Sequence, residues 1–302
     1  MTHAPVALFV YNRPWHTRQT VEALLANDEA AQTPLYIFSD APKDASANKA
    51  VAEVRAYIAG ITGFESVTAI ERSRNFGLAN SIIDGVTQVC QQQGRVIVLE
   101  DDIVTSPYFL RFMNDGLGFY ENDERVISIS GYVYPIKESL PETFFLRGAD
   151  CWGWATWKRG WSLFEPDGKV LLKKLEQRSL TYAFDSNGTY PFTRMLKNQI
   201  KGKTNSWAIR WHATAFAENK LTLYPGRTLV HNIGVDGSGT NCTPTDDFAG
   251  DIATSIIEVR SIPFEENNFA RQQVMLFHEG LRSSLPLRVL RKLKNILAKS
   301  TK

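Results

Sequence analysis

The stretch Val96-Ile97-Val98-Leu99-Glu100-Asp101-Asp102 joins a short apolar run to three consecutive acids. An apolar run of this length, bounded by polar residues, is typical of a strand buried on both faces of a sheet. At the end of such a strand, residues 100 and 102 point one way and Asp101 points the other. Clustered carboxylates favour a hard cation with oxygen ligands, such as Mg²⁺ or Mn²⁺. Alternatively, Asp101 or Asp102 only caps the next helix or faces solvent.

The segments around this strand predict an α/β fold. Residues 6–11 also have the composition of a buried strand, and residues 35–38, a shorter segment 66–70 and residues 126–130 are further candidate strands. Between them, helical patterns begin at Pro14 and cover residues 48–59, 79–92 and 106–119, the last opened by Ser106 as N-cap and Pro107 as N1. Buried strands alternating with helices predict a mostly parallel sheet flanked by helices. Ligands of such sheets bind beyond the carboxyl ends of the strands.

Polar residues follow three other strands or precede the next helix, and we expect them at the same edge of the sheet. They are Asn12-Arg13, Ser39-Asp40 and Asn75-Phe76-Gly77. An arginine can pair with a phosphate, an aspartate can accept hydrogen bonds from a ribose or base, and Asn-x-Gly presents free N–H groups. Alternatively, Asp40 heads a turn and Asn75 is an ordinary N-cap. Together, these residues provide what a nucleoside diphosphate requires.

Composition and charge exclude several classes of protein. The chain has 302 residues, of which 43% are hydrophobic and 22% charged, which is typical of a folded protein and excludes disorder and collagen. Its net charge of +2 hides seven basic groups and no acid in residues 281–302, so the remaining 280 residues carry −5. A body of that sign is a poor candidate for binding nucleic acid. No apolar run approaches the length of a membrane span, and no secretory signal is visible.

The chain divides near residue 130, where its composition changes. Residues 1–130 form the predicted nucleotide-sugar-binding half, and 131–280 the acceptor-binding and catalytic half of the same domain. The second half concentrates tryptophan in residues 151–161 and 207–211 and glycine in 232–247. Residues 281–302 form a basic amphipathic tail. Three cysteines without a Cys-x-x-Cys spacing favour the reducing cytoplasm.

The ordered set of these motifs resembles the GT-A glycosyltransferases. The nearer resemblance is to bacterial polysaccharide and lipopolysaccharide transferases, distantly similar to N-acetylglucosaminyltransferase I. It covers roughly residues 5–245 and includes Glu100-Asp101-Asp102 as a DxD-type motif. Further along the chain it includes Cys151-Trp152-Gly153-Trp154 and the loop Asn232-Ile233-Gly234-Val235-Asp236-Gly237. The resemblance implies a GT-A, Rossmann-like sheet and a nucleotide-sugar donor.

The resemblance also assigns roles to individual residues. It implies that Asp102 is the ligand of Mn²⁺ or Mg²⁺, and that Asp101 lies near the ribose or the metal. Asn12, Arg13 and Asp40 would hold the nucleoside, and Asn75 the base or ribose. His231 would complete the metal shell, although a lone histidine is more often structural.

The acceptor side has less specific candidates. Trp152 and Trp154 are candidate sugar platforms with Asp236, and the alternative for the tryptophans is a packed core. Asp150 is the first candidate for the general base that deprotonates the acceptor. A solvated loop aspartate is the alternative role for Asp150. The competing candidates for the base are Asp185, Glu218 and Asp236. The segment 206–211 has no acid where inverting relatives often carry one.

These observations predict a metal-dependent glycosyltransferase that moves a hexose from a UDP-sugar of galactose, galactofuranose or GlcNAc type to a glycan. The acceptor would belong to surface polysaccharide or lipopolysaccharide biosynthesis, with inversion at the sugar favoured. One alternative is a sugar-1-phosphate nucleotidyltransferase, although Tyr11-Asn12-Arg13-Pro14 lacks the glycine-rich loop that cradles a triphosphate. Another is a non-catalytic glycan-binding module.

The sequence of the tail predicts where the protein acts. The pattern of residues 285–299 predicts a helix with leucines on one face and basic residues around them. Such helices lie on anionic membranes, and the alternative is that the apolar face packs on the domain. We therefore expect a cytoplasmic protein, peripheral on the inner face of the cell membrane, with a glycan or lipid-linked acceptor.

Overall fold

An eight-stranded sheet forms the centre of the protein, seen in a computed structural model that describes residues 3–237 and 245–281. The predicted tail helix therefore lies outside the described residues. In chain order the strands of the sheet are β1 (Val6–Val10), β2 (Pro34–Ser39), β3 (Ser66–Glu71), β4 (Arg95–Glu100), β6 (Val126–Ser130), β7 (Thr143–Arg147), β8 (Trp154–Trp157) and β9 (Leu221–Pro225).

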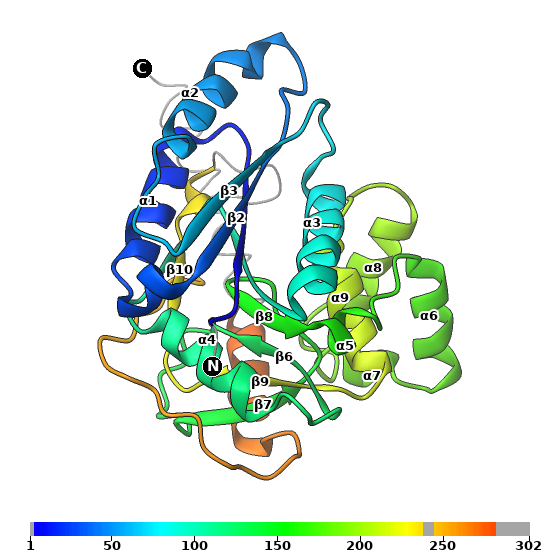
Figure 1. The fold of residues 1–302 in the computed structure, drawn as a ribbon. Coiled ribbons are helices and arrows are strands. Elements are labelled where there is room, and N and C mark those ends of the chain that lie inside the picture. Colours follow the sequence, from blue (N-terminus) through cyan, green and yellow to red (C-terminus); the bar gives the residue numbers. More distant parts are fainter. Residues whose placement is uncertain (1–2, 238–244, 282–302) are drawn as a thin grey trace, which may run out of the picture.

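The order of the strands creates a switch point between β1 and β4. Across the sheet the order is β3-β2-β1-β4-β8-β6-β9-β7, with β7 and β8 running against the other six (Figure 1). The chain moves outward from β1 to β3 and then returns to the other side of β1. In open α/β sheets, the carboxyl ends of the strands at such a reversal form the usual ligand crevice. Here those ends lead to Arg13 and to Glu100-Asp101-Asp102.

Helices cover both faces of the sheet. They are α1 (Pro14–Leu25), α2 (Asn48–Ile58), α3 (Leu78–Gln93), α4 (Phe109–Phe119), α5 (Lys158–Trp161), α6 (Gly168–Gln177), α7 (Thr181–Phe184), α8 (Phe192–Ile200) and α9 (Trp207–Ala217), with the 3-10 turns η1 (Asp28–Gln32), η2 (Ala45–Ala47) and η3 (Ile233–Asp236). A further helix begins at residue 268 and is described to residue 281. A short antiparallel ribbon of β5 (Ile103–Thr105) and β10 (Val230–Asn232) lies outside the sheet. Within the described ranges, none of the helices has the length and hydrophobicity needed to cross a bilayer.

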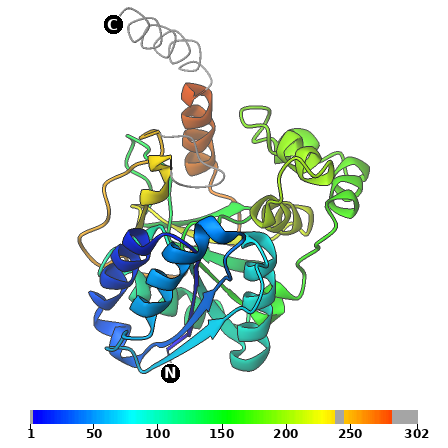
Figure 2. The same ribbon diagram turned by 90° about the horizontal axis from the view of Figure 1, so that it is seen from above.

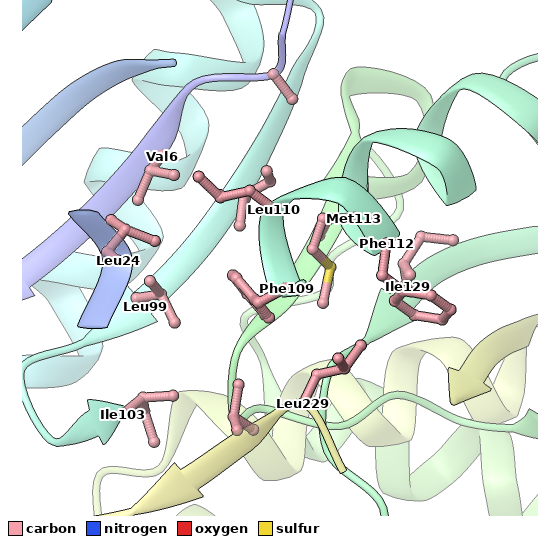
Figure 3. Packing of buried hydrophobic residues seen from close by; sticks show 14 of the residues in the cluster. Val6, Leu24, Leu99, Ile103, Phe109, Leu110, Phe112, Met113, Ile129 and Leu229 are labelled. Atoms are coloured by element: carbon pink, nitrogen blue, oxygen red, sulfur yellow. The ribbon is translucent and has the colours of Figure 1, made fainter. Parts of the chain in front are cut away.

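Alternation along β1 explains why two separate cores form. Val6 and Leu8 face a core that α1, α2 and α4 complete with Leu24 and Phe109, part of which Figure 3 shows. Phe9 faces the opposite core, which α3 and α9 complete. Because successive side chains of a strand point to opposite faces, a continuous apolar run supplies both cores at once.

The predicted α/β class, with a mostly parallel central sheet flanked by helices, is confirmed. Strands from both predicted halves of the chain join one sheet, since β8 lies between β4 and β6. The start predicted for the fourth helix is wrong, because α4 begins at Phe109 rather than at Pro107. Ser106 instead closes a turn, accepting a hydrogen bond from the Tyr108 N–H at 3.2 Å and donating one to the Ala253 carbonyl at 2.7 Å.

The packing of α3 on β1 predicts the effect of a substitution at Gly85. A Cβ at this position would lie 2.7 Å from the ring of Phe9, which is itself stacked on Phe38. We expect Gly85→Val to lower the free energy of unfolding by about 2–3 kcal/mol through overpacking. Urea denaturation measures this loss. Gly60→Val is the control, because its nearest neighbour would be 3.7 Å away, and an equal loss in both variants would contradict the packing explanation.

Candidate active site at the carboxyl ends of β1 and β4

Arg13 and the acidic triplet meet at the switch point of the sheet. The parallel pairing of β1 with β4 places Phe9 opposite Glu100, so the segments that leave both strands start side by side. Pro14 begins α1 and fixes Arg13 as the residue just before the helix. The predicted convergence of these side chains at one edge follows from this register.

Arg13 lies between the two aspartates. Its Nη2 donates to Asp102 Oδ2 at 2.9 Å and also contacts Asp101 Oδ1, while its Nε lies 3.4 Å from Asp101 Oδ2. All three side chains are largely buried, with 18% of Arg13, 6% of Asp101 and 11% of Asp102 exposed. The Nη1 of Arg13 is buried and has no hydrogen-bond partner among the described residues. The guanidinium therefore neutralises part of the acidic cluster and keeps one donor available.

The cluster still carries an excess of negative charge. The pKa of Glu100 is raised to about 8, mainly by burial and also by the charges of Asp102 and Asp101. The charge of Arg13 and a hydrogen bond with the Trp207 side chain oppose this rise. Burial also raises the pKa of Asp101, although the Arg13 charge opposes this. Burial lowers the pKa of Arg13, but the two aspartates outweigh it and leave the pKa raised. Glu100 is therefore mostly protonated at neutral pH, and the two aspartates beside one arginine leave a net negative charge that favours a further cation.

The β5–β10 ribbon and η3 cover Asp102. The Ile233 N–H donates to the Asp102 carbonyl at 2.9 Å, and the Asn232 side chain accepts from the Gly234 N–H at 2.8 Å. A Cβ on Gly234 would lie 2.0 Å from Asp102 Oδ2 and 2.9 Å from Arg13 Nη1. Glycine is therefore required at position 234 because the backbone approaches the carboxylate so closely.

Asp236 closes the same corner from η3. Its Oδ2 lies 3.1 Å from Nε2 of His16, a buried residue in the first turn of α1. The loop that begins at Asn232 is described up to Gly237, and residues 238–244 lie outside the described residues.

Asp40 and Asn75 meet at the neighbouring part of the edge. The carboxylate of Asp40 is buried and accepts from three backbone N–H groups, those of Ala41 at 2.9 Å, Phe76 at 2.8 Å and Gly77 at 2.9 Å. The Asn75 amide donates to the Ala41 carbonyl at 2.7 Å. These contacts join the end of β2 to the start of α3, so both residues hold the backbone here.

A pocket of about 410 Å³ opens beside this junction. It is lined by Arg74, Asn75, Phe76, Asn80 and Asp84. The pocket combines an aromatic ring, amides and charged groups, which suits a polar aromatic ligand such as a nucleobase. Asn12 follows β1 at the same edge and is half-buried.

The two tryptophans proposed as sugar platforms lie in different environments. Trp152 is half-buried, and its ring packs edge-on against Tyr132 with centroids 4.6 Å apart. Trp154 has no exposed surface, and its ring lies 5.4 Å from that of Trp207 and 5.6 Å from that of Trp211. The expected platform role of Trp154 is therefore wrong, because Trp154 belongs to the core between the sheet and α9.

Asp150 lies just before β8, where the chain returns to the carboxyl edge of β4 and β6. Burial raises the pKa of Asp150 to about 6, although the backbone N–H groups of Cys151 and Trp152 lower it. The Cys151 N–H donates to its Oδ1 at 2.7 Å. Tyr134 and Tyr224 lie close enough for the Asp150 charge to raise their pKa values, after burial. This partly desolvated carboxylate suits a general base near neutral pH.

Two competing candidates for the base are engaged elsewhere. Asp185 accepts from the Thr193 N–H at 2.5 Å at the start of α8. Glu218 pairs with Lys174 where α6 meets the end of α9. Both residues stabilise the helices beside the sheet.

The described residues contain no group of three or more His, Cys, Asp or Glu side chains placed to hold a metal ion. His231 is half-buried in β10 opposite Val104, one residue before the segment that covers Asp102. Mg²⁺ and similar ions commonly use one or two carboxylates, with substrate phosphates and water as the other ligands. The donor set of Asp101 and Asp102, with its excess negative charge, fits such an ion.

Sequence reasoning missed the contacts that assemble this site. It placed Arg13 with the nucleoside and did not predict its pairing with the aspartates, which are 88 and 89 positions away in the chain. His16 was also missed, although its place in the first turn after Pro14 was a usable signal.

Comparisons with known proteins give little further information. Neither the known protein families nor the curated proteins contain a match to this sequence. Among solved structures, the mannosyltransferase PcManGT from Pyrobaculum calidifontis in complex with GDP-Man and Mn²⁺ is 11% identical, with 72% of this chain and 69% of that chain covered and a TM-score of 0.36.

Two further solved structures are similarly distant. Glucosyl-3-phosphoglycerate synthase from Mycobacterium tuberculosis, in complex with Mn²⁺, UDP and glucosyl-3-phosphoglycerate, is 12% identical with a TM-score of 0.34, covering 59% of this chain and 67% of that chain. TarS from S. aureus is 13% identical with a TM-score of 0.33, covering 49% of this chain and 24% of that chain. These values are too low to carry a fold family or an activity over to this chain.

The buried position of Arg13 predicts a pH-dependent loss of stability on its removal. Arg13→Gln leaves two buried carboxylates without their counter-charge and should lower the free energy of unfolding by about 3 kcal/mol at pH 8. A carboxyl group whose pKa is raised by folding destabilises the folded protein as the pH rises through that pKa. The loss of stability in Arg13→Gln should therefore be smaller at pH 5 than at pH 8.

Urea denaturation of Arg13→Gln and the wild-type protein at both pH values measures this effect. Arg18→Gln on the adjoining helix α1 is the control, because the Arg18 side chain is 54% exposed and lies 3.9 Å from Glu22. A deficit that stays constant or grows at pH 5 would contradict the proposed charge balance.

Proposed function

We propose that the protein is a metal-dependent glycosyltransferase that moves a hexose from a UDP-sugar to a glycan acceptor. The observation that carries the proposal is the buried group of Arg13, Asp101 and Asp102 at the switch point between β1 and β4. A strand-end cluster of acids, with an arginine and a close-approaching backbone, matches the needs of a sugar diphosphate and its cation. The motifs that resemble GT-A enzymes support the same function.

The diphosphate would lie beside Arg13. The Nη1 atom of Arg13 is buried without a partner among the described residues, and guanidinium groups bind phosphate oxygens well. Asp102 would hold Mn²⁺ or Mg²⁺ with the diphosphate oxygens, with Asp101 beside it and His231 as a further candidate. When bound, such a cation neutralises the charge that grows on the leaving diphosphate.

The nucleoside would occupy the pocket beside Asn75 and Phe76. Asn75 supplies an amide group to this pocket, and Asp40 fixes its backbone wall through the N–H groups of Phe76 and Gly77. Asn12, which follows β1, would also contact the nucleoside. Phe76 offers a ring face for a base, although the guanidinium of Arg72 already lies 4.5 Å from the centroid of that ring. The role of Asp40 would thus be to position the pocket.

The transfer would be a displacement at the anomeric carbon of the sugar. Asp150 takes the proton of the acceptor hydroxyl, the acceptor oxygen bonds to the anomeric carbon, and the bond from that carbon to the diphosphate oxygen breaks with its electron pair leaving on UDP. A displacement from the opposite face inverts the anomeric centre, which we favour. Trp152 and Asp236 would contact the acceptor or the sugar, and water is excluded by η3 above the acids.

The acceptor would belong to surface polysaccharide or lipopolysaccharide biosynthesis. We propose that the segment 285–299, through its basic residues, holds the enzyme on the inner face of the cell membrane, beside a lipid-linked acceptor. Donors of the galactose, galactofuranose or GlcNAc type fit this role.

Asp102 gives the most direct test of the metal role. Asp102→Asn removes one charge without changing the size of the side chain, and we expect it to abolish Mn²⁺-dependent binding of UDP and to lower transfer by about 100-fold or more. Calorimetry with UDP, with and without Mn²⁺, measures the binding. Asp115→Asn on α4 is the control, since this carboxylate is about half exposed. Wild-type affinity in Asp102→Asn would remove the proposed metal site.

Asp150 gives a separate test of the base. The carboxyl with a pKa of about 6 must be ionised to accept a proton, so kcat of the wild-type enzyme should fall as the pH drops below about 6. Asp150→Asn should lower kcat by about 100-fold to 10,000-fold, abolish this acidic limb and leave UDP binding unchanged. The release of UDP from the donor measures kcat, with Asp185→Asn as control. An unchanged acidic limb in Asp150→Asn would assign the base to another residue.

A further inference from the structure

A group of helices beside the sheet forms a lobe with an unusual charge. This basic lobe consists of residues 168–203 and contains α6, α7 and α8. Its inner side packs on α9 through a small core that includes Leu171, Leu175 and Leu196. Figure 1 shows the lobe on the side of the molecule away from α1 and α2. None of the residues assigned to the candidate active site belongs to it.

The basic lobe and the rest of the protein carry opposite formal charges. Residues 168–203 contain eight basic residues and two acids, giving a formal charge of +6. The residues outside this lobe and outside 281–302 carry a formal −11. Such segregation in a chain of net charge +2 gives the lobe a positive field of its own.

The cations of the lobe are exposed. Seven of the eight basic side chains are exposed, namely Lys169, Lys173, Arg178, Arg194, Lys197, Lys201 and Lys203. The eighth, Lys174, pairs with Glu218 of α9. Lys197 lies 4.0 Å from Glu176, so even this ion pair is at the limit of contact. The outer surface therefore presents positive charge from both α6 and α8.

Apolar side chains are exposed among these cations. Val170 on α6 is 48% exposed, Met195 on α8 is 37% exposed, and Tyr182 on α7 is 68% exposed. A surface that only binds a soluble polyanion needs the cations and gains nothing from these apolar groups. A lipid surface uses both, because basic residues meet the anionic head groups while apolar side chains enter the boundary below them.

We propose that the basic lobe binds the surface of an anionic lipid bilayer. Lys173 and Arg194 would contact head groups, and Val170 and Met195 would insert between them. In Figure 2 the lobe and the helix that begins at residue 268 project to the same side of the molecule, and residue 281, where the basic C-terminal sequence begins, ends the described part of that helix. The lobe would thus give a second point of attachment, independent of the tail and of the proposed reaction.

The test compares vesicle binding by variants of the full chain. Co-sedimentation uses vesicles of equal parts phosphatidylcholine and phosphatidylglycerol, with pure phosphatidylcholine as reference. Each cation near an anionic surface contributes about fivefold to binding, so Lys173→Gln with Arg194→Gln should weaken it about 30-fold. Lys49→Gln with Arg111→Gln is the matched control, since it removes one lysine and one arginine from exposed positions outside the lobe.

A second variant pair separates lipid from a soluble polyanion. Val170→Ser with Met195→Ser should weaken vesicle binding about tenfold while keeping every charge. Unchanged vesicle binding in Lys173→Gln with Arg194→Gln would overturn the proposal. The proposal would also be overturned if the protein bound heparin as tightly as vesicles and if the two serine substitutions left vesicle binding unchanged. Such a result would assign the lobe to a soluble polyanion. Neither assay requires transfer, so failure of the proposed enzyme function would leave both results intact, and equal unfolding temperatures confirm that the variants fold.

Discussion

Arg13 allows three consecutive acids to end a buried strand. Without its guanidinium, Asp101 and Asp102 would place two charges next to a third carboxyl in a region from which water is largely removed, at a large cost in free energy. The pairing of β1 with β4 brings Arg13, which follows β1, beside the acids that end β4. The compensation is incomplete, because burial, together with the neighbouring carboxylates, still raises the pKa values of Glu100 and Asp101. The fold therefore holds a partly neutralised anionic cluster at the position where a ligand of the sheet would lie.

The covering segment depends on the same cluster. The β5–β10 ribbon returns the chain to Asp102 through the Ile233 N–H, and the lack of a side chain at Gly234 lets the backbone lie against the carboxylate. Asp236 then meets His16 on α1, so the first helix, the acids and the covering turn form one connected set. Any displacement of Asp102 would move the cover with it, which couples the shape of the site to its charge.

The sequence predicted the N-terminal part of the fold well and the rest less completely. The apolar runs of β1, β2, β4 and β6 are distinct because these strands are buried on both faces, and their spacing identified the sheet and its functional edge. The strand β8 was not predicted because its tryptophans masked a strand pattern, and Trp154 proved to be core. The convergence of the edge residues followed from the fold class, whereas the pairing of Arg13 with acids far away in the chain required the register between strands. Asp40 shows the same limit, since its three backbone donors include Phe76 and Gly77, which lie far along the chain.

The position of β8 has a consequence for synthesis on the ribosome. β4 pairs with β1 on one side, but its other neighbour is β8, which follows it by more than fifty residues. Until residue 157 has emerged, a nascent chain would expose one long edge of β4, rich in valine and ready to pair with another polypeptide. We therefore expect truncations near residue 130 to favour self-association over a soluble fragment.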